Sequence, residues 1–148
     1  MKIYIATSWS NKLLANYVTA ILRNKDRHSV HCFCDILTEA GDDEDATWKH
    51  KNISENVVIP WVQEACRQDM ERIQEADTIV LILPAGASSH MEAGYAKGLG
   101  KKLYVLVDET ISAAIPKAEV MYCMADRIVP FSLNGSSEFR DFVNKLLA

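Results

Sequence analysis

The sequence lacks any apolar run long enough to cross a membrane. Runs such as Ile79 to Leu83 fall far short of the ~20 residues that span a bilayer. Met1 and Lys2 lead directly into the strand-like Ile3-Tyr4-Ile5, with no signal-peptide pattern. We therefore expect a cytoplasmic protein that does not insert into membranes.

Cysteine is scarce, and its spacing matches neither a C-x-x-C pair nor a zinc-binding pattern. The four cysteines are Cys32, Cys34, Cys66 and Cys123. A chain of 148 residues buries enough surface to fold without disulfides or a structural metal. We expect the cysteines to be reduced and mostly buried, and we expect no metal site.

Positive charge is also in short supply. The chain has 16 Lys and Arg against 20 Asp and Glu, a net charge of −4, and no basic stripe. Because phosphate neutralisation supplies most of the affinity for duplex nucleic acid, that partner is disfavoured. Neither the P-loop pattern nor G-x-G-x-x-G occurs. Small molecules or proteins are the expected partners.

Strand-like and helix-like segments alternate along the chain, which is typical of a parallel sheet with crossover helices. The expected strands are 3–6, 28–35, 77–83, 103–107 and 127–131. The expected helices are 13–22, 59–76, 90–98 and 136–147, with a weaker helical signal over 118–124. The pattern predicts one α/β domain over 1–148: a flavodoxin-like or Rossmann-like three-layer sandwich with a five-stranded parallel sheet. The apolar segment 77–83 is its expected central strand, and ligands should bind at the carboxyl ends of the strands.

The segment 38–56 is too polar to pack and too long for an ordinary connection. We expect an irregular, mobile loop. A solvated surface excursion is one interpretation. Trp48, isolated in this polar stretch, keeps open the alternative of a lid over a ligand.

Asp69 falls inside the apolar stripe of its predicted helix, between Cys66 and Ile73. Its carboxylate should therefore point toward the sheet. Because burying an unpaired charge is unfavourable, such a group is usually hydrogen-bonded, paired or functional. A structural carboxylate at the edge of the stripe and a functional one remain equally open.

Glu92 follows the central strand and a turn of small residues. Ser89-His90-Met91-Glu92 matches the S-x-x-E capping box, in which the Glu only caps its own helix. Alternatively, Glu92 is a nucleophile whose ionised form is favoured by the backbone N–H groups and dipole at a helix N-terminus. Ala93 and Gly94 leave room for a ligand beside it.

Two polar turns could hold an anion or a sugar, because each places hydroxyls at the start of a helix. The first runs from Thr7 through Ser8 and Trp9 to Asn11, and the second contains Ser88 and Ser89. Trp9 or Trp48 could stack on a base, although the role of an ordinary core or surface aromatic is favoured for each.

Three stretches together give the sequence a family resemblance. They are Ile3-Tyr-Ile-Ala-Thr-Ser8, Asp69-Met-Glu-Arg-Ile-Gln-Glu-Ala-Asp77-Thr-Ile-Val-Leu-Ile-Leu83 and Ser88-Ser-His-Met-Glu-Ala-Gly-Tyr-Ala96. With these, the sequence resembles the nucleoside 2-deoxyribosyltransferase family, including relatives that hydrolyse the N-glycosidic bond of nucleoside 5′-monophosphates. The first turn departs from the family, because Thr7-Ser8-Trp9 stands where relatives carry Gly-Pro or Gly-Ser.

The resemblance implies the roles of several residues. Glu92 matches the family's nucleophile, Asp69 the carboxylate that assists at the sugar and base, and Asp77 a structural position at the start of a strand. It also implies a homodimer or higher homo-oligomer, in which a neighbouring subunit completes the pocket with a segment near Met121 to Asp126 that includes Met124.

The resulting hypothesis is cleavage of the N-glycosidic bond of a (deoxy)nucleoside or nucleoside 5′-monophosphate. A covalent glycosyl-Glu92 intermediate would then pass to a free base or to water, with no cofactor. The expected substrate-binding residues are Thr7, Ser8, Trp9, Ser88, Ser89 and Met124. The alternative is a nucleotide-binding or TIR-like module, either non-catalytic or NAD-cleaving.

Overall fold

The computed structural model describes residues 1–23, 28–32, 52–108, 120–132 and 137–146. Trp48, Cys34 and most of the predicted 38–56 loop lie outside these ranges. None of the helices in the described part of the chain combines the length and the apolarity that a membrane span needs.

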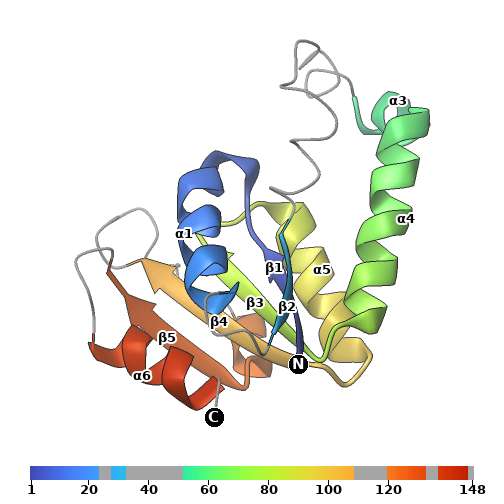
Figure 1. Cartoon of the computed structure of the whole chain (residues 1–148). Coiled ribbons are helices and arrows are strands. Elements are labelled where there is room, and N and C mark those ends of the chain that lie inside the picture. Colours follow the sequence, from blue (N-terminus) through green and yellow to red (C-terminus); the bar gives the residue numbers. More distant parts are fainter. Residues whose placement is uncertain (24–27, 33–51, 109–119, 133–136, 147–148) are drawn as a thin grey trace.

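The described residues form an alternating series of strands and helices (Figure 1). The strands are β1 (Lys2–Ala6), β2 (Ser29–Cys32), β3 (Thr78–Leu83), β4 (Lys102–Asp108) and β5 (Arg127–Phe131). The α-helices are α1 (Lys12–Arg23), α3 (Ile53–Asn56), α4 (Pro60–Glu75), α5 (Ala87–Gly98) and α6 (Ser137–Leu146). Two short 3₁₀ helices are η1 (Trp9–Asn11) and η4 (Val120–Met124).

The strands form one parallel sheet in the order β2-β1-β3-β4-β5. This confirms the predicted α/β class and the five-stranded parallel sheet. β3 is central, as predicted, and all six of its residues are buried. The order is the flavodoxin-like one, in which the chain leaves β1 in one direction and β3 in the other. A ligand crevice is expected at that switch point.

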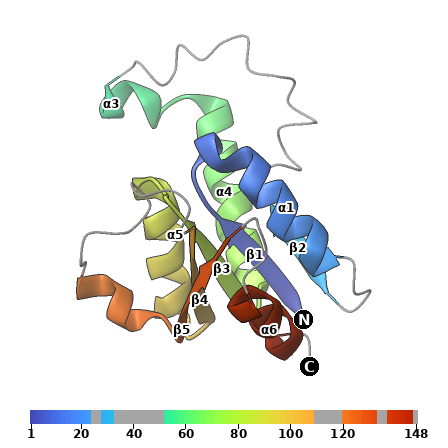
Figure 2. The ribbon, with the colours of Figure 1, turned by 90° about the vertical axis from the view of Figure 1, so that its left-hand side faces the viewer.

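Alternation along the strands separates two cores on opposite faces of the sheet. Ile3, Ile5 and Val80 pack with residues of α1 and α6 in one core, whereas Tyr4 and Ile79 pack with residues of α4 and α5 in the other. Figure 2 shows α1 and α6 on one side of the strands and α5 on the other. The sheet is thus the middle layer of a three-layer sandwich.

Helix α5 begins earlier than predicted, at Ala87 rather than near His90. Gly86 is its N-cap, with extended backbone and no side-chain capping bond. Ser89 is therefore buried within the helix and is not its cap. The capping-box interpretation of Ser89 and Glu92 is wrong, because small residues before Ser89 extend the helix by nearly a turn.

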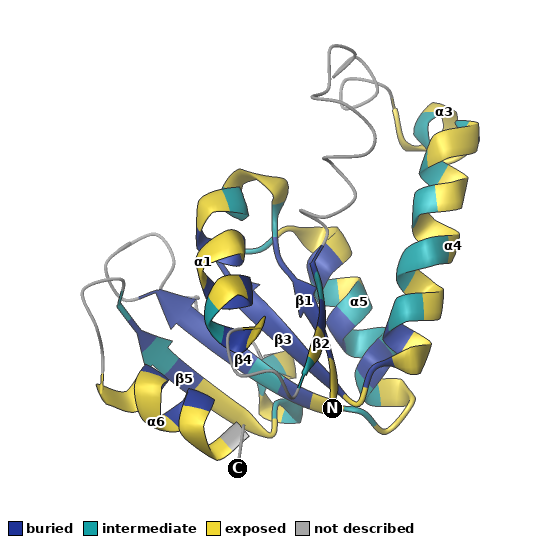
Figure 3. Ribbon diagram, viewed as in Figure 1, coloured by how far each residue is buried: buried dark blue, intermediate teal, exposed yellow. Residues whose placement is uncertain are grey.

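Helix α4 confirms the predicted span, but its apolar stripe is only partly buried. Ile73 is buried near the C-terminal end, whereas Met70 and Trp61 are 40% and 46% exposed. In Figure 3 the half of α4 next to α3 is coloured mainly as exposed and half-buried. Helix α4 extends beyond the sheet, so the sheet does not cover the apolar side of its first half. Hydrophobic periodicity cannot predict this, because it shows only which side of a helix is apolar.

Two smaller expectations are also corrected. The predicted irregular segment 38–56 ends in a short helix, α3, whose N-cap Asn52 accepts a hydrogen bond from the backbone N–H of Glu55. Cys66 and Cys123 are exposed, and only Cys32 is buried among the cysteines that the structure describes. Cys66 and Cys123 form no disulfide within the described residues.

Candidate active site

The turns after β1 and β3 are tied together at the switch point of the sheet. The buried Thr7 hydroxyl donates to the carbonyl of Ile82 over 2.8 Å. The Asn11 side-chain amide donates to the carbonyl of Pro84 over 2.5 Å and to the Thr7 hydroxyl over 3.3 Å. These bonds hold the turn after β1 beside the turn after β3, at the place where this fold class binds ligands. Ser88 and Ser89, predicted in the second turn, lie instead in the first turn of α5.

Three polar side chains meet on the sheet face that α4 and α5 cover. Tyr4 comes from β1, Asp69 from α4 and Glu92 from α5. The Tyr4 hydroxyl lies close enough to both carboxylates for each of them to affect its pKa, and the two carboxylates interact electrostatically. A hydroxyl carries a single hydrogen, so Tyr4 donates to one carboxylate at a time. We call this set the carboxylate cluster.

Burial dominates the electrostatics of the cluster. It raises the pKa of Glu92 to about 8, and the charge of Asp69 raises it further, while the Tyr4 hydrogen bond opposes both effects. Burial also raises the pKa of Asp69, against the Tyr4 hydrogen bond and the positive charge of Arg72. Burial and the two neighbouring carboxylates raise the pKa of Tyr4, which stays protonated. The cluster therefore retains a proton at neutral pH.

This result corrects one expectation about Glu92. The sequence placed it in the first turn of its helix, where the backbone would favour its ionised form. Because α5 starts at Ala87, no acidic residue lies in its first turn. Desolvation rather than the helix terminus sets the pKa of Glu92.

Asp69 keeps an unused acceptor. Its Oδ1 is buried and has no hydrogen-bond partner among the described residues. The nearest cation is the guanidinium of Arg72, whose Nη1 lies 4.0 Å from Oδ1. A buried carboxylate oxygen without a donor is unfavourable for a purely structural residue, and it leaves an acceptor for a ligand O–H or N–H.

The predicted binding residues differ in how far they are buried. Thr7 and Ser89 are buried, Ser8 and Met124 are half-buried, and Ser88 is exposed. The hydroxyl of Thr7 donates to a backbone carbonyl, whereas the hydroxyl of Ser8 accepts from the exposed Ser10. These five residues remain predicted ligand contacts.

Trp9 begins η1 in the first turn and is 41% exposed. An indole this exposed is not a core residue, whereas the alternative of a surface aromatic stays open. Its stacking on a base remains a prediction.

The 3₁₀ helix η4 carries Met124 and lies against α5. The ring of His90 on α5 bridges the two: its Nδ1 lies 2.8 Å from the carbonyl of Gly86, and its Nε2 lies 2.9 Å from the Tyr122 hydroxyl. Nδ1 carries a proton because a carbonyl only accepts, and in the neutral ring Nε2 accepts from the Tyr122 hydroxyl. His90 thus positions η4. In the described part of the chain, no group of His, Cys, Asp or Glu side chains could hold a metal ion.

Asp77 has the structural role that the resemblance implies. It immediately precedes β3, and its Oδ2 accepts from the backbone N–H of Lys2 over 2.8 Å. Its own N–H donates to the Lys2 carbonyl over 2.9 Å. Asp77 therefore aligns the starts of β1 and β3 and does not join the carboxylate cluster.

The fold and the cluster define a class: a flavodoxin-like sandwich with two coupled carboxylates on the sheet face that α4 and α5 cover. Two solved structures are similar to this chain in fold. A CMP N-glycosidase from Clostridium botulinum, BcmB, superposes with a TM-score of 0.55 at 15% identity, over 99% of this chain and 98% of that one. A 2-deoxyribosyltransferase from Bacillus psychrosaccharolyticus superposes with a TM-score of 0.63 at 17% identity, over 99% of this chain and 96% of that one.

These similarities confirm the predicted resemblance at the level of the fold, over nearly the whole chain. No family model and no curated protein sequence matches it. The sequence analysis named Asp69 and Glu92 but missed Tyr4. In the sequence, Tyr4 is an ordinary residue of the predicted strand Ile3-Tyr4-Ile5. Its even position was the one sign of its role, because alternate side chains of a strand point to opposite faces and Tyr4 lies on the face opposite Ile3 and Ile5.

Proposed function

We propose that the chain cleaves the N-glycosidic bond of a (deoxy)nucleoside or nucleoside 5′-monophosphate by double displacement. The carboxylate cluster carries this proposal, because it brings together two half-buried carboxylates from different helices whose charges are coupled. The similarity in fold to an N-glycosidase and a deoxyribosyltransferase supports the same chemistry.

In the first step, an oxygen of ionised Glu92 bonds to the anomeric carbon of the sugar. The bond from that carbon to the base nitrogen breaks, and its electron pair leaves with the base. Asp69 donates its proton to the departing base. Positive charge develops on the sugar in such a transition state, and the neighbouring carboxylate of Glu92 stabilises it. The product is a glycosyl ester of Glu92.

In the second step, water or a free base attacks the anomeric carbon. The ester bond to Glu92 breaks and restores the carboxylate, and Asp69 takes the proton that the incoming nucleophile loses. Hydrolase and transferase activities share every step except this one. The same cluster supports both, and no cofactor takes part in either.

Tyr4 is a positioning residue in this scheme. Its hydrogen bond lowers the pKa of both carboxylates, which favours ionised Glu92 as the nucleophile. When Asp69 carries the proton, the Tyr4 hydroxyl is free to donate to Glu92 alone. The buried, unpartnered Oδ1 of Asp69 supplies an acceptor for a hydroxyl or amino group of the substrate.

The test is chromatographic. Base release is measured from ribo- and deoxynucleosides and their 5′-monophosphates, with and without a second free base, for the parent protein and for Glu92→Gln. Release without acceptor identifies a hydrolase, and exchange that requires acceptor identifies a transferase. Mass spectrometry of a quenched reaction should show one glycosyl group on the parent protein and none on the variant. No release by the folded parent from any substrate would refute the proposal.

The second candidate, NAD cleavage by a TIR-like module, breaks the same kind of bond. NAD therefore belongs in the substrate set as a separate arm. Release of nicotinamide, with silence from every nucleoside and nucleotide, would favour it. The coupled Asp69 is the observation that favours the first candidate.

A further inference from the structure

A cavity lies away from the carboxylate cluster, where β4, β5 and α6 meet. Its volume is about 370 Å³, within the ~300–1,000 Å³ range of small-molecule sites. Its lining residues are Lys102, Tyr104, Asp126, Arg127, Phe142 and Lys145. Lys102 and Arg127 are the first residues of β4 and β5, so the cavity opens at the amino ends of the strands.

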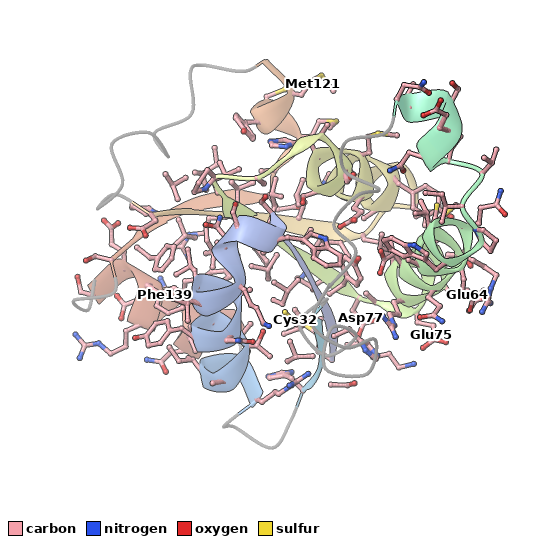
Figure 4. All side chains as sticks on the ribbon, turned by 90° about the horizontal axis from the view of Figure 1, so that it is seen from above. Cys32, Glu64, Glu75, Asp77, Met121 and Phe139 are labelled. Atoms are coloured by element: carbon pink, nitrogen blue, oxygen red, sulfur yellow. The ribbon has the colours of Figure 1, made fainter. Side chains whose placement is uncertain are left out.

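This cavity is on the other face of the sheet from the carboxylate cluster. Tyr104 and Phe142 pack in the core shared with α1 and α6, whereas Tyr4 packs in the core shared with α4 and α5. Seen from above, Phe139 of α6 and Glu64 of α4 lie on opposite sides of the molecule (Figure 4). A ligand in the cavity therefore cannot touch Asp69 or Glu92.

The polar wall of the cavity is cationic. Lys102, Arg127 and Lys145 come from three different elements, and within the described residues none of them forms an ion pair. Asp126 is the single carboxylate in the lining, and groups outside the lining neutralise its negative charge. Its Oδ2 accepts from Lys97 over 2.7 Å and from the backbone N–H of Leu103 over 2.8 Å. The cavity thus concentrates positive charge on a chain whose net charge is −4.

The remaining wall is aromatic. The rings of Tyr104 and Phe142 pack edge to face, with centroids 5.1 Å apart and planes at 72°. Phe142 is buried and Tyr104 is half-buried. A flat ring can pack against such a wall, while Arg127 offers a planar, bidentate donor to a phosphate and the two lysines add charge.

From this juxtaposition we propose that the cavity binds a phosphate monoester that carries a planar ring. The phosphate lies among Lys102, Arg127 and Lys145, and the ring packs on Tyr104. This is a second site, and it does not depend on the activity proposed for Glu92. Nucleoside monophosphates and other aromatic phosphates share this chemistry.

The test is a titration of the ¹⁵N-labelled full chain followed by two-dimensional NMR. Phenyl phosphate is the main probe, because it has a ring and a phosphate but no glycosidic bond. Inorganic phosphate and phenol are the controls, and a nucleoside 5′-monophosphate is the second ligand. Phenyl phosphate should shift the amide signals of residues 102–104, 126–127 and 142–145 and bind roughly tenfold more tightly than inorganic phosphate. Added salt should weaken it.

Arg127→Ala should weaken phenyl phosphate about tenfold, and Lys145→Ala should weaken it in the same direction. Arg140→Ala is the matched control, because it removes an exposed positive charge from α6 outside the cavity lining. An equal loss in Arg140→Ala, equal affinity for phenyl phosphate and inorganic phosphate, or no shifts at the cavity would each overturn the proposal. Tighter binding of the nucleotide than of phenyl phosphate at these signals would support it and identify the nucleotide as the better ligand.

Discussion

The charge of Asp69 raises the pKa of Glu92, although the two residues lie on different helices of the same layer. This coupling means that the two carboxylates titrate as a pair, with apparent pKa values that belong to both. The form with one proton contains both an acid and a potential nucleophile.

The rate of base release should have a bell-shaped dependence on pH. Activity requires one proton on the pair, so kcat/KM should fall as the pH rises through about 8, where the pair loses its last proton. Tyr4→Phe should move this falling limb to higher pH, because the lost hydrogen bond had lowered the pKa of both carboxylates. Initial rates between pH 5 and 10 measure both effects.

Tyr95→Phe is the control for Tyr4→Phe. Tyr95 also lies on the α5 side of the sheet, but its hydroxyl accepts from Gln74 and does not reach the cluster. It should leave the falling limb in place. A limb that does not move in Tyr4→Phe would show that Tyr4 has no electrostatic effect on the pair.

Asp69→Asn should slow base release by roughly 10²–10⁴-fold, the usual contribution of a general acid. It should also change the shape of the profile. The variant lacks the general acid whose deprotonation causes the fall in rate at high pH. Its residual rate should therefore rise with pH until Glu92 is ionised and then stay level. The pKa of Glu92 should fall below about 8 because the charge of Asp69 that raises it is gone.

The Glu92 pKa can be measured without activity, from the ¹³C signal of its side-chain carboxyl group. The expected order of the Glu92 pKa is Asp69→Asn below the parent protein and Tyr4→Phe above it. The reverse order would contradict the description of the cluster.

Glu92→Gln should make the folded protein more stable at alkaline pH. Glu92 has a pKa of about 8 in the folded protein against 4.5 for an ordinary Glu. Between these values the folded state holds a proton that the unfolded state has released, so this group lowers stability as the pH rises. The variant should lose that decline and gain on the order of 2 kcal/mol in free energy of unfolding at pH 8.5.

Urea denaturation at pH 5 and pH 8.5 measures this difference. Glu138→Gln is the control, because Glu138 is exposed on α6. Its stability should follow that of the parent protein at both pH values. Equal stabilisation of the two variants at pH 8.5 would mean that net charge, rather than burial of Glu92, is responsible.

Thr7→Val should destabilise the protein by about 1–2 kcal/mol. The substitution keeps the shape of the side chain but removes the buried hydroxyl that donates to Ile82 and accepts from Asn11. Ser8→Ala is the matched control in the same turn, because its hydroxyl contacts only the exposed Ser10. It should cost under about 0.5 kcal/mol.

Thermal and urea unfolding of the two variants test this contrast. If Ser8 contacts the substrate as predicted, Ser8→Ala should raise KM while leaving stability unchanged. Equal stability of Thr7→Val and the parent protein would show that the bond to Ile82 contributes nothing to the junction of the two turns.

Local pattern was sufficient for the fold class. Alternation of short apolar runs with amphipathic segments identified all five strands, including the central 78–83, whose burial on both faces follows from its continuous apolar sequence. The C-terminal strand was predicted residue for residue. Such features depend on near neighbours in the chain, and those neighbours are visible in the sequence.

The ends of the helices, and which of their faces are buried, were less predictable than the strands. The start of α5 was missed because Ala87 and Ser88 carry no apolar periodicity, although a helix accepts them readily. The exposed half of α4 was missed because its stripe resembles a core face. Periodicity shows which side of a helix is apolar, but not whether another element covers it.

The sequence by itself determined that Asp69 and Glu92 are present, on helices that flank an apolar strand. Only the tertiary structure decided that they form one site with Tyr4 and retain a proton. The pKa of Glu92 depends on burial and on a charge from another helix. Both are set by distances through space, and those distances exist only once β1, α4 and α5 have packed together.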